Sequence, residues 1–163
     1  MDRRSLILAA AVTPLAAGAA GARVSYSSGG GNRLLVKALS AGGFSLQTCL
    51  LALRRARNPD LRGFARLEAS EQRAYARALG AVPGSVPPSP AQAAMLAQLR
   101  TLGGRAFDAA YLRGQILGHE ELLHLNAGLA NAGPNQVARS VATVAVPSIE
   151  THLAILSRLR GVA

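Results

Sequence analysis

Three residues whose side chains can bind metals or exchange protons interrupt otherwise apolar patterns in this chain. They are Glu71, His119 and His152. One carboxylate and two imidazoles are common ligands of zinc, iron and related transition metals. Buried ionisable groups are costly unless they are paired or ligated. If the three side chains face the interior together, they predict mutual hydrogen bonding, solvent access or the binding of one divalent metal ion. That ion is the only cofactor that the pattern indicates.

The spacing around the two histidines limits the kind of metal site. Ferritin-like bundles build a di-iron site from several carboxylates and a Glu-x-x-His motif. Here Ile116 and Ile149 stand three residues before the two histidines, so the motif is missing. The pattern favours a mononuclear or vestigial site over an active di-iron oxidase. The alternative is a hydrogen-bonded polar cluster that fixes how the helices align.

Each of these residues lies on a predicted helical stripe, in which apolar residues recur every three or four positions. The stripe of the first helix, from about residue 32, contains Leu35, Leu39, Gly42, Leu46, Cys49 and Leu53. For residues 59–79 we predict Phe64, Leu67, Glu71, Ala74 and Ala78. For residues 105–131 we predict Leu112, Gln115, His119, Leu122, Asn126 and Leu129. For residues 134–160 we predict Val137, Val141, Val144, Ser148, His152, Ile155 and Leu159.

Capping and helix-breaking residues separate these helices. Asn32 is a candidate N-cap, Asn58-Pro59 predicts a stop and a restart, and Gly80 predicts a C-terminal cap. Ser89-Pro90-Ala91-Gln92 resembles a capping box, which predicts a short extra helix before the long third one. Pro147 should bend the last helix. The sequence therefore predicts an all-α, four-helix bundle.

Composition agrees with a single helical domain. The 163 residues are 50% hydrophobic and only 4% aromatic, with Ala and Leu abundant. The net charge of +10 comes from arginine, with Lys37 the only lysine. No nucleic-acid-reading motif accompanies this charge, so we do not expect nucleic acid as a partner. Cys49, the sole cysteine, cannot form an intrachain disulfide, and its apolar neighbours predict that it packs in the core.

The N-terminus has the three parts of a secretory signal peptide. Arg3 and Arg4 precede an apolar run, and small residues at Ala20-Gly21-Ala22 suit a cleavage site. The paired arginines also resemble a twin-arginine signal. We expect a signal peptide at 1–22, a flexible linker at 23–31 and the bundle at 32–161. The mature chain should be soluble in the periplasm or cell envelope, and we predict no transmembrane span in it.

Other charged residues have simpler interpretations. Glu120, Glu121 and His124 should face outward, and Asp108 should interact with the dipole of its helix. The arginines of the second helix should form a solvated face; these are Arg62, Arg66, Arg73 and Arg77. There is no serine-centred elbow, phosphate-binding loop or Cys–His pair by spacing. The sequence therefore favours a protein that is not an enzyme.

Several short blocks of this chain resemble one bacterial family. They are Phe107-Asp108-Ala109-Ala110-Tyr111 followed by His119, Pro147 with His152-Leu153, Ala41-Gly42-Gly43, and Phe64-Ala65. Together they resemble the "domain of unknown function 4142" family over about residues 34–159. The resemblance implies an exported, ferritin-like bundle of unassigned activity.

The same resemblance bears on the ligands. Members typically carry Glu at the position of Gln47 and an Asp-His pair at Glu71-Gln72. Two ligand positions are therefore neutral amides in this chain, while both histidines remain. This departure weighs against a complete metal site.

Two functions follow from these observations. The first is an exported ferritin-like bundle with a weak or vestigial divalent-metal site, serving metal handling or stress protection. The second is a non-enzymatic envelope protein that binds a protein partner or an anionic membrane surface through its arginine-rich face. The two differ in whether Glu71, His119 and His152 converge and in whether the arginines form one exposed patch.

Overall fold

The computed structural model describes residues 29–160, and this part of the chain is helical without any strand. It contains α1 (Gly30–Arg55), α2 (Pro59–Ala78), α3 (Pro90–Thr101), α4 (Gly104–Ala132) and α5 (Gln136–Arg160). The prediction of an all-α bundle with a short helix before the long third one is confirmed. The predicted signal peptide at 1–22 lies outside the described residues.

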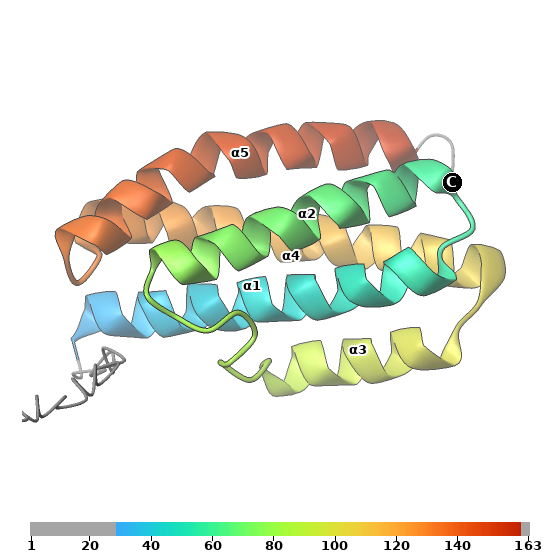
Figure 1. Ribbon diagram of the computed structural model, residues 1–163, viewed down its shortest axis with the longest axis horizontal. Coiled ribbons are helices and arrows are strands. Elements are labelled where there is room, and N and C mark those ends of the chain that lie inside the picture. The colour runs from blue at the N-terminus through green and yellow to red at the C-terminus, as the bar shows by residue number, and fades with distance from the viewer. Residues whose placement is uncertain (1–28, 161–163) are drawn as a thin grey trace, which may run out of the picture.

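Four long helices lie side by side, with α1 antiparallel to α2 and α4 antiparallel to α5 (Figure 1). The segment with α3 runs back along the bundle, so α2 and α4 point the same way. The α1 helix packs against both α2 and α4, and α5 packs mainly against α4. The contact between α2 and α5 is the sparsest of those between the long helices that pack as neighbours. The short helix α3 lies outside this group, against α1 and α4.

Most helix ends follow the predicted capping. The Asn58 side chain accepts hydrogen bonds from the first backbone N–H groups of α2, Ser89 and Gln92 form a reciprocal capping box, and Gly80 has φ of +73°. The prediction for Asn32 was wrong. Because α1 begins at Gly30 with Gly29 as its N-cap, Asn32 lies within the first turn.

The Phe-Asp-x-x-Tyr block holds the bundle together at the α1–α2 turn. The Asp108 carboxylate accepts hydrogen bonds from the backbone N–H groups of Arg57 and Asn58 at 2.9–3.2 Å. Phe107 and Tyr111 are fully buried, with their rings parallel and their centroids 6.0 Å apart. Asp108 lies beyond the first turn of α4, so the dipole role predicted for it gives way to this link between helices.

The rotations of two helices differ from the prediction. The predicted stripes of α1 and α4 are buried, apart from Leu53 at the end of α1. In α2, Leu67 is exposed and Glu68 is buried, so the predicted stripe was off by one position. In α5, Val137 and Val144 are exposed and the inward line is Ala138, Ala142, Ala145, Ile149, His152 and Leu156. His152 belongs to both the predicted and the observed line of α5.

Two helices, α1 and α5, are long and apolar enough to cross a membrane by length and composition alone. The sequence alone predicts no such helix after residue 22. The α1 helix is central in the bundle, and 67% of its most apolar 18-residue segment is buried. Its apolar composition is therefore that of a core helix. In α5 only 28% of the corresponding segment is buried, and Val137 and Val144 of this helix are exposed.

Candidate metal centre

A buried carboxylate and two buried imidazoles meet at mid-height in the bundle. Glu68 comes from α2, His119 from α4 and His152 from α5, and the three residues are between 1% and 3% exposed. We call these residues the central cluster. It lies between two groups of apolar residues, one containing Phe64, Phe107 and Tyr111 and the other rich in alanine.

The facing atoms of the central cluster form a nearly equilateral triangle. His119 Nε2 lies 3.2 Å from His152 Nδ1, and Glu68 Oε2 lies 3.4 Å from the first atom and 3.1 Å from the second. Ligands at about 2.0–2.1 Å from a tetrahedral metal ion are roughly 3.3 Å from one another. The three atoms therefore have the separation of three ligands around one metal ion.

The outer nitrogen of each imidazole is held by a hydrogen-bond acceptor. His119 Nδ1 lies 2.8 Å from the backbone carbonyl of Gln115, which can only accept, so this nitrogen donates. His152 Nε2 lies 3.4 Å from a carboxylate oxygen of Glu71. With a proton on each outer nitrogen, the inner nitrogens can direct lone pairs at the centre. Metal-binding histidines are usually oriented in this way.

The second oxygen of Glu68 is also held in place. Its Oε1 accepts hydrogen bonds from the Ser45 hydroxyl at 2.7 Å and from the Gln72 amide at 3.0 Å. Gln115 continues this polar layer by donating to the Thr48 hydroxyl at 2.8 Å. No fully buried side-chain nitrogen or oxygen in the described residues lacks a partner. The carboxylate is thus fixed from α1 and α2 while its Oε2 faces the histidines.

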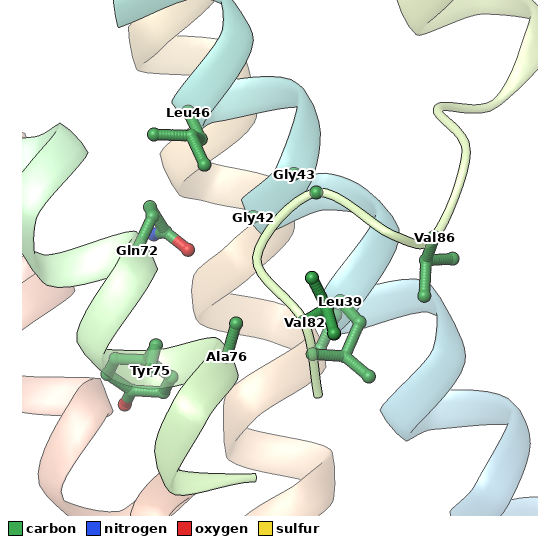
Figure 2. A pocket seen from close by; sticks show the side chains of 11 residues that line it. Leu39, Gly42, Gly43, Leu46, Gln72, Tyr75, Ala76, Val82 and Val86 are labelled. Atoms are coloured by element: carbon green, nitrogen blue, oxygen red, sulfur yellow. The ribbon is translucent and has the colours of Figure 1, made fainter. Parts of the chain in front are cut away.

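A glycine on α1 leaves room for Gln72. Figure 2 shows Gln72 reaching from α2 toward α1 beside Gly42. A Cβ atom on Gly42 would clash with the side-chain oxygen of Gln72. The next residue, Gly43, lies under Gly84 and Val86 of the loop that follows α2. The Ala-Gly-Gly block therefore supports the central cluster through the amide that holds Glu68.

Charge interactions in the central cluster favour an ionised carboxylate. Burial alone would raise the pKa of Glu68, but hydrogen bonds from His119 and His152 outweigh it and hold that pKa well below its ordinary value. Burial likewise opposes the charged form of His152, while the hydrogen bond and charge of Glu68, followed by the charge of Glu71, raise its pKa above 6.5 overall. Without a metal ion, the cluster is therefore stabilised by a proton.

The two sides of the central cluster differ in access. On one side the Phe64 ring lies with its centroid 5.6 Å from that of His119 and 5.4 Å from that of His152. On the other side is a cavity of about 30 Å³, lined in part by Glu68, Glu71 and His152. This volume holds about two water molecules. Among the described carboxylates, Glu71 alone contacts the cluster and also reaches solvent, with its side chain 35% exposed.

The structure brings both predicted histidines together, but the carboxylate between them is that of Glu68 and not that of the predicted Glu71. His119 and His152 converge, whereas Glu71 lies behind His152, on the solvent side, and Glu68 takes the central place. Sequence reasoning missed Glu68. The signal for it was the spacing Leu61, Phe64, Glu68, Gln72 and Tyr75, which places bulkier side chains inside than the predicted line did.

The remaining polar residues are mostly as expected. Glu120, Glu121 and His124 are exposed, and Cys49 is fully buried, where burial followed by the charge of Glu68 raises its pKa to about 12. The thiol is therefore unreactive.

The arginine-rich face of α2 is partly used within the fold. Arg62 donates to backbone carbonyls at the end of α1, and Arg73 donates to the carbonyl of Ala69. Arg66 and Arg77 are exposed. Binding of a partner or an anionic membrane surface through these arginines stays a prediction.

The fold and the central cluster define an α-helical bundle with one buried, internally supported Glu–His–His constellation. The chain belongs to the family described as domain of unknown function (DUF4142), whose model matches residues 16–159. This confirms the family inferred from the short sequence blocks. Searches among curated proteins and among solved structures give no match.

Proposed function

We propose that the protein binds one divalent transition-metal ion at Glu68, His119 and His152. The observation that carries this proposal is the triangle of ligand atoms, with sides of 3.1, 3.2 and 3.4 Å, in which both imidazoles are oriented by outside acceptors. The donor set fits a metal ion well, because two imidazoles and a carboxylate suit zinc and iron and are too rich in nitrogen for magnesium or calcium.

Three protein ligands leave one position of a tetrahedral ion open, as in catalytic rather than structural zinc sites. A bound ion would act as a Lewis acid or, if it were iron, as a redox centre. The surrounding residues supply negative charge, the orientation of the ligands and the exclusion of water. Glu68 contributes a full negative charge, Gln115 and Glu71 orient the imidazoles, and Phe64 excludes water from one side. Metal handling or stress protection is the role that this arrangement supports.

The proposal is tested by measuring bound metal in protein purified without chelators or a histidine tag. We expect about one zinc or iron ion per chain in the wild type and none in the His119→Ala/His152→Ala double variant. Glu68→Gln keeps the side-chain shape and should also lose the metal. His124→Ala, which changes an exposed histidine, is the matched control and should keep it. Metal-free wild type with destabilised variants would make the cluster a structural polar layer.

We also propose export to the periplasm or cell envelope, which rests on the signal-peptide pattern of residues 1–22. The test is the N-terminal sequence of the protein recovered from the periplasmic fraction. A mature chain that begins near Arg23 supports export, whereas a cytoplasmic chain that retains Met1 contradicts it.

A further inference from the structure

The central cluster is almost completely buried, so a metal ion needs a path to it. Its three members are at most 3% exposed, and Phe64 covers the side next to the aromatic residues. On the α1 side, Ser45 and Thr48 are 3% and 1% exposed. Access is therefore restricted to the remaining side, between α2 and α5, where the bundle packs most sparsely.

A cavity with both polar and apolar walls lies on that side. Besides Glu68, Glu71 and His152, its walls include Asn126 and Ser148. Asn126 is 4% exposed and donates through its amide nitrogen to the Leu122 carbonyl. The wall combines these carboxylate, amide and hydroxyl groups with the apolar side chains of Ala38, Leu122, Ala145 and Ile149. Its two carboxylates suit the space to a cation or to water rather than to an anion.

Glu71 joins this cavity to solvent. Its Oε2 accepts a hydrogen bond from the Ser148 hydroxyl at 3.1 Å and lies 3.4 Å from His152 Nε2. Beyond it, Tyr75 lines both the cavity and a shallow apolar groove on the outer surface between α2 and α5. One carboxylate thus touches a predicted metal ligand on one side and water on the other.

We propose that Glu71 is the port through which a divalent cation reaches the central cluster, capturing it at the surface and passing it through the cavity beside Glu68 and His152. This inference rests on the proposed metal binding. A carboxylate at the mouth of a narrow passage raises the local cation concentration and the association rate. The cation leaves along the same path, so a carboxylate that lowers the barrier of this passage speeds departure as well as entry. Glu71 therefore sets the exchange rates more than the affinity.

The test measures Zn²⁺ exchange in the full chain by stopped flow, with a zinc-responsive dye for association and transfer to an excess of chromophoric chelator for dissociation. Glu71→Gln keeps an oxygen that can accept from His152 and removes the charge. We expect both rates to fall about tenfold and the dissociation constant to change less than threefold. Glu150→Gln removes an exposed carboxylate of α5 that has no partner among the described residues, and it should leave both rates unchanged.

A second pair of variants tests the cavity itself. Ala145 is 1% exposed and lines the cavity, whereas the equally buried Ala142 does not. Ala145→Val should slow association and dissociation together, and Ala142→Val, the control for added bulk in α5, should not. Circular dichroism establishes that each variant is folded.

The outcomes separate the two proposals. Unchanged rates in Glu71→Gln and Ala145→Val, with zinc still bound, would overturn the port and leave the metal site standing. Faster dissociation alone in Glu71→Gln would also overturn it, because Glu71 would then only orient His152. Absence of zinc from the wild type would contradict the metal site itself.

Discussion

The two halves of the core, on either side of the central cluster, are built differently. The half around Phe64, Phe107 and Tyr111 contains the buried aromatic rings and links α1, α2 and α4 through Asp108. The other half is rich in alanine and leucine and borders the cavity beside Glu71. Large rings fix the ligands from one side, while small residues leave space on the other. The aromatic side of the central cluster is therefore rigid, and the side with small residues gives access to it.

The largest expected effect is the loss of a buried ring. Phe107→Ala should destabilise the protein by about 3–5 kcal/mol, because it leaves a cavity and removes the ring stacked on Tyr111. Val144→Ala in the exposed face of α5 should change stability by less than about 0.5 kcal/mol. Urea denaturation followed by circular dichroism measures both. Similar losses for the two variants would contradict the stabilising role of the buried Phe107 ring, since Val144 lies outside both halves of the core.

A smaller effect is expected from Gly42→Ala, which tests the support of Glu68. The new Cβ forces the flexible end of Gln72 to move, and the hydrogen bond to Glu68 is lost, at a cost of about 0.5–1.5 kcal/mol. The metal dissociation constant should also weaken, since a ligand loses its orienting partner. Gly63→Ala, with open space around its Cβ position, is the control and should be neutral or stabilising. Equal behaviour of the two variants would count against this role of Gln72.

The smallest expected effect is a pH dependence of the metal-free protein. Because folding raises the pKa of His152, its stabilisation is complete below about pH 6.5 and is lost as the pH rises through the higher folded value. Folding lowers the pKa of Glu68, so its contribution is lost only in acid, below the unfolded value near 4.5. With a chelator present, the melting temperature should therefore fall between about pH 6 and pH 9.

Zinc should reverse this slope, since metal binding competes with protons at the histidines. His152→Gln should flatten the slope of the metal-free protein, and His124→Gln should leave it unchanged, because His124 is exposed on α4. A melting temperature of the metal-free protein that rises over the same range would contradict a proton shared within the central cluster.

The sequence predicted the helices and their order better than their rotations. Proline, asparagine and glycine at helix ends act locally, so Pro59, Gly80 and the Ser89–Gln92 box could be read directly. The stripe through His119 was also correct, because leucines repeat clearly along α4. Such signals depend only on neighbours a few residues apart.

The rotations of α2 and α5 could not be predicted because alanine carries a weak apolar signal. In α5 the inward line uses Ala138, Ala142 and Ala145, which allow close packing, while the more hydrophobic Val137 and Val144 face solvent. In α2 a shift of one position exchanged Glu71 for Glu68. The convergence of the two histidines was thus predictable and the carboxylate beside them was not, since only tertiary packing decides which glutamate faces inward.

The most direct measurement is a crystal structure of the zinc-loaded protein with an anomalous difference map at the zinc edge. We predict one peak inside the triangle of Glu68 Oε2, His119 Nε2 and His152 Nδ1, at about 2.0–2.2 Å from each atom. A peak at surface residues such as His124 or Glu121, or an ordered Glu68–His119–His152 cluster without any peak, would contradict the metal site.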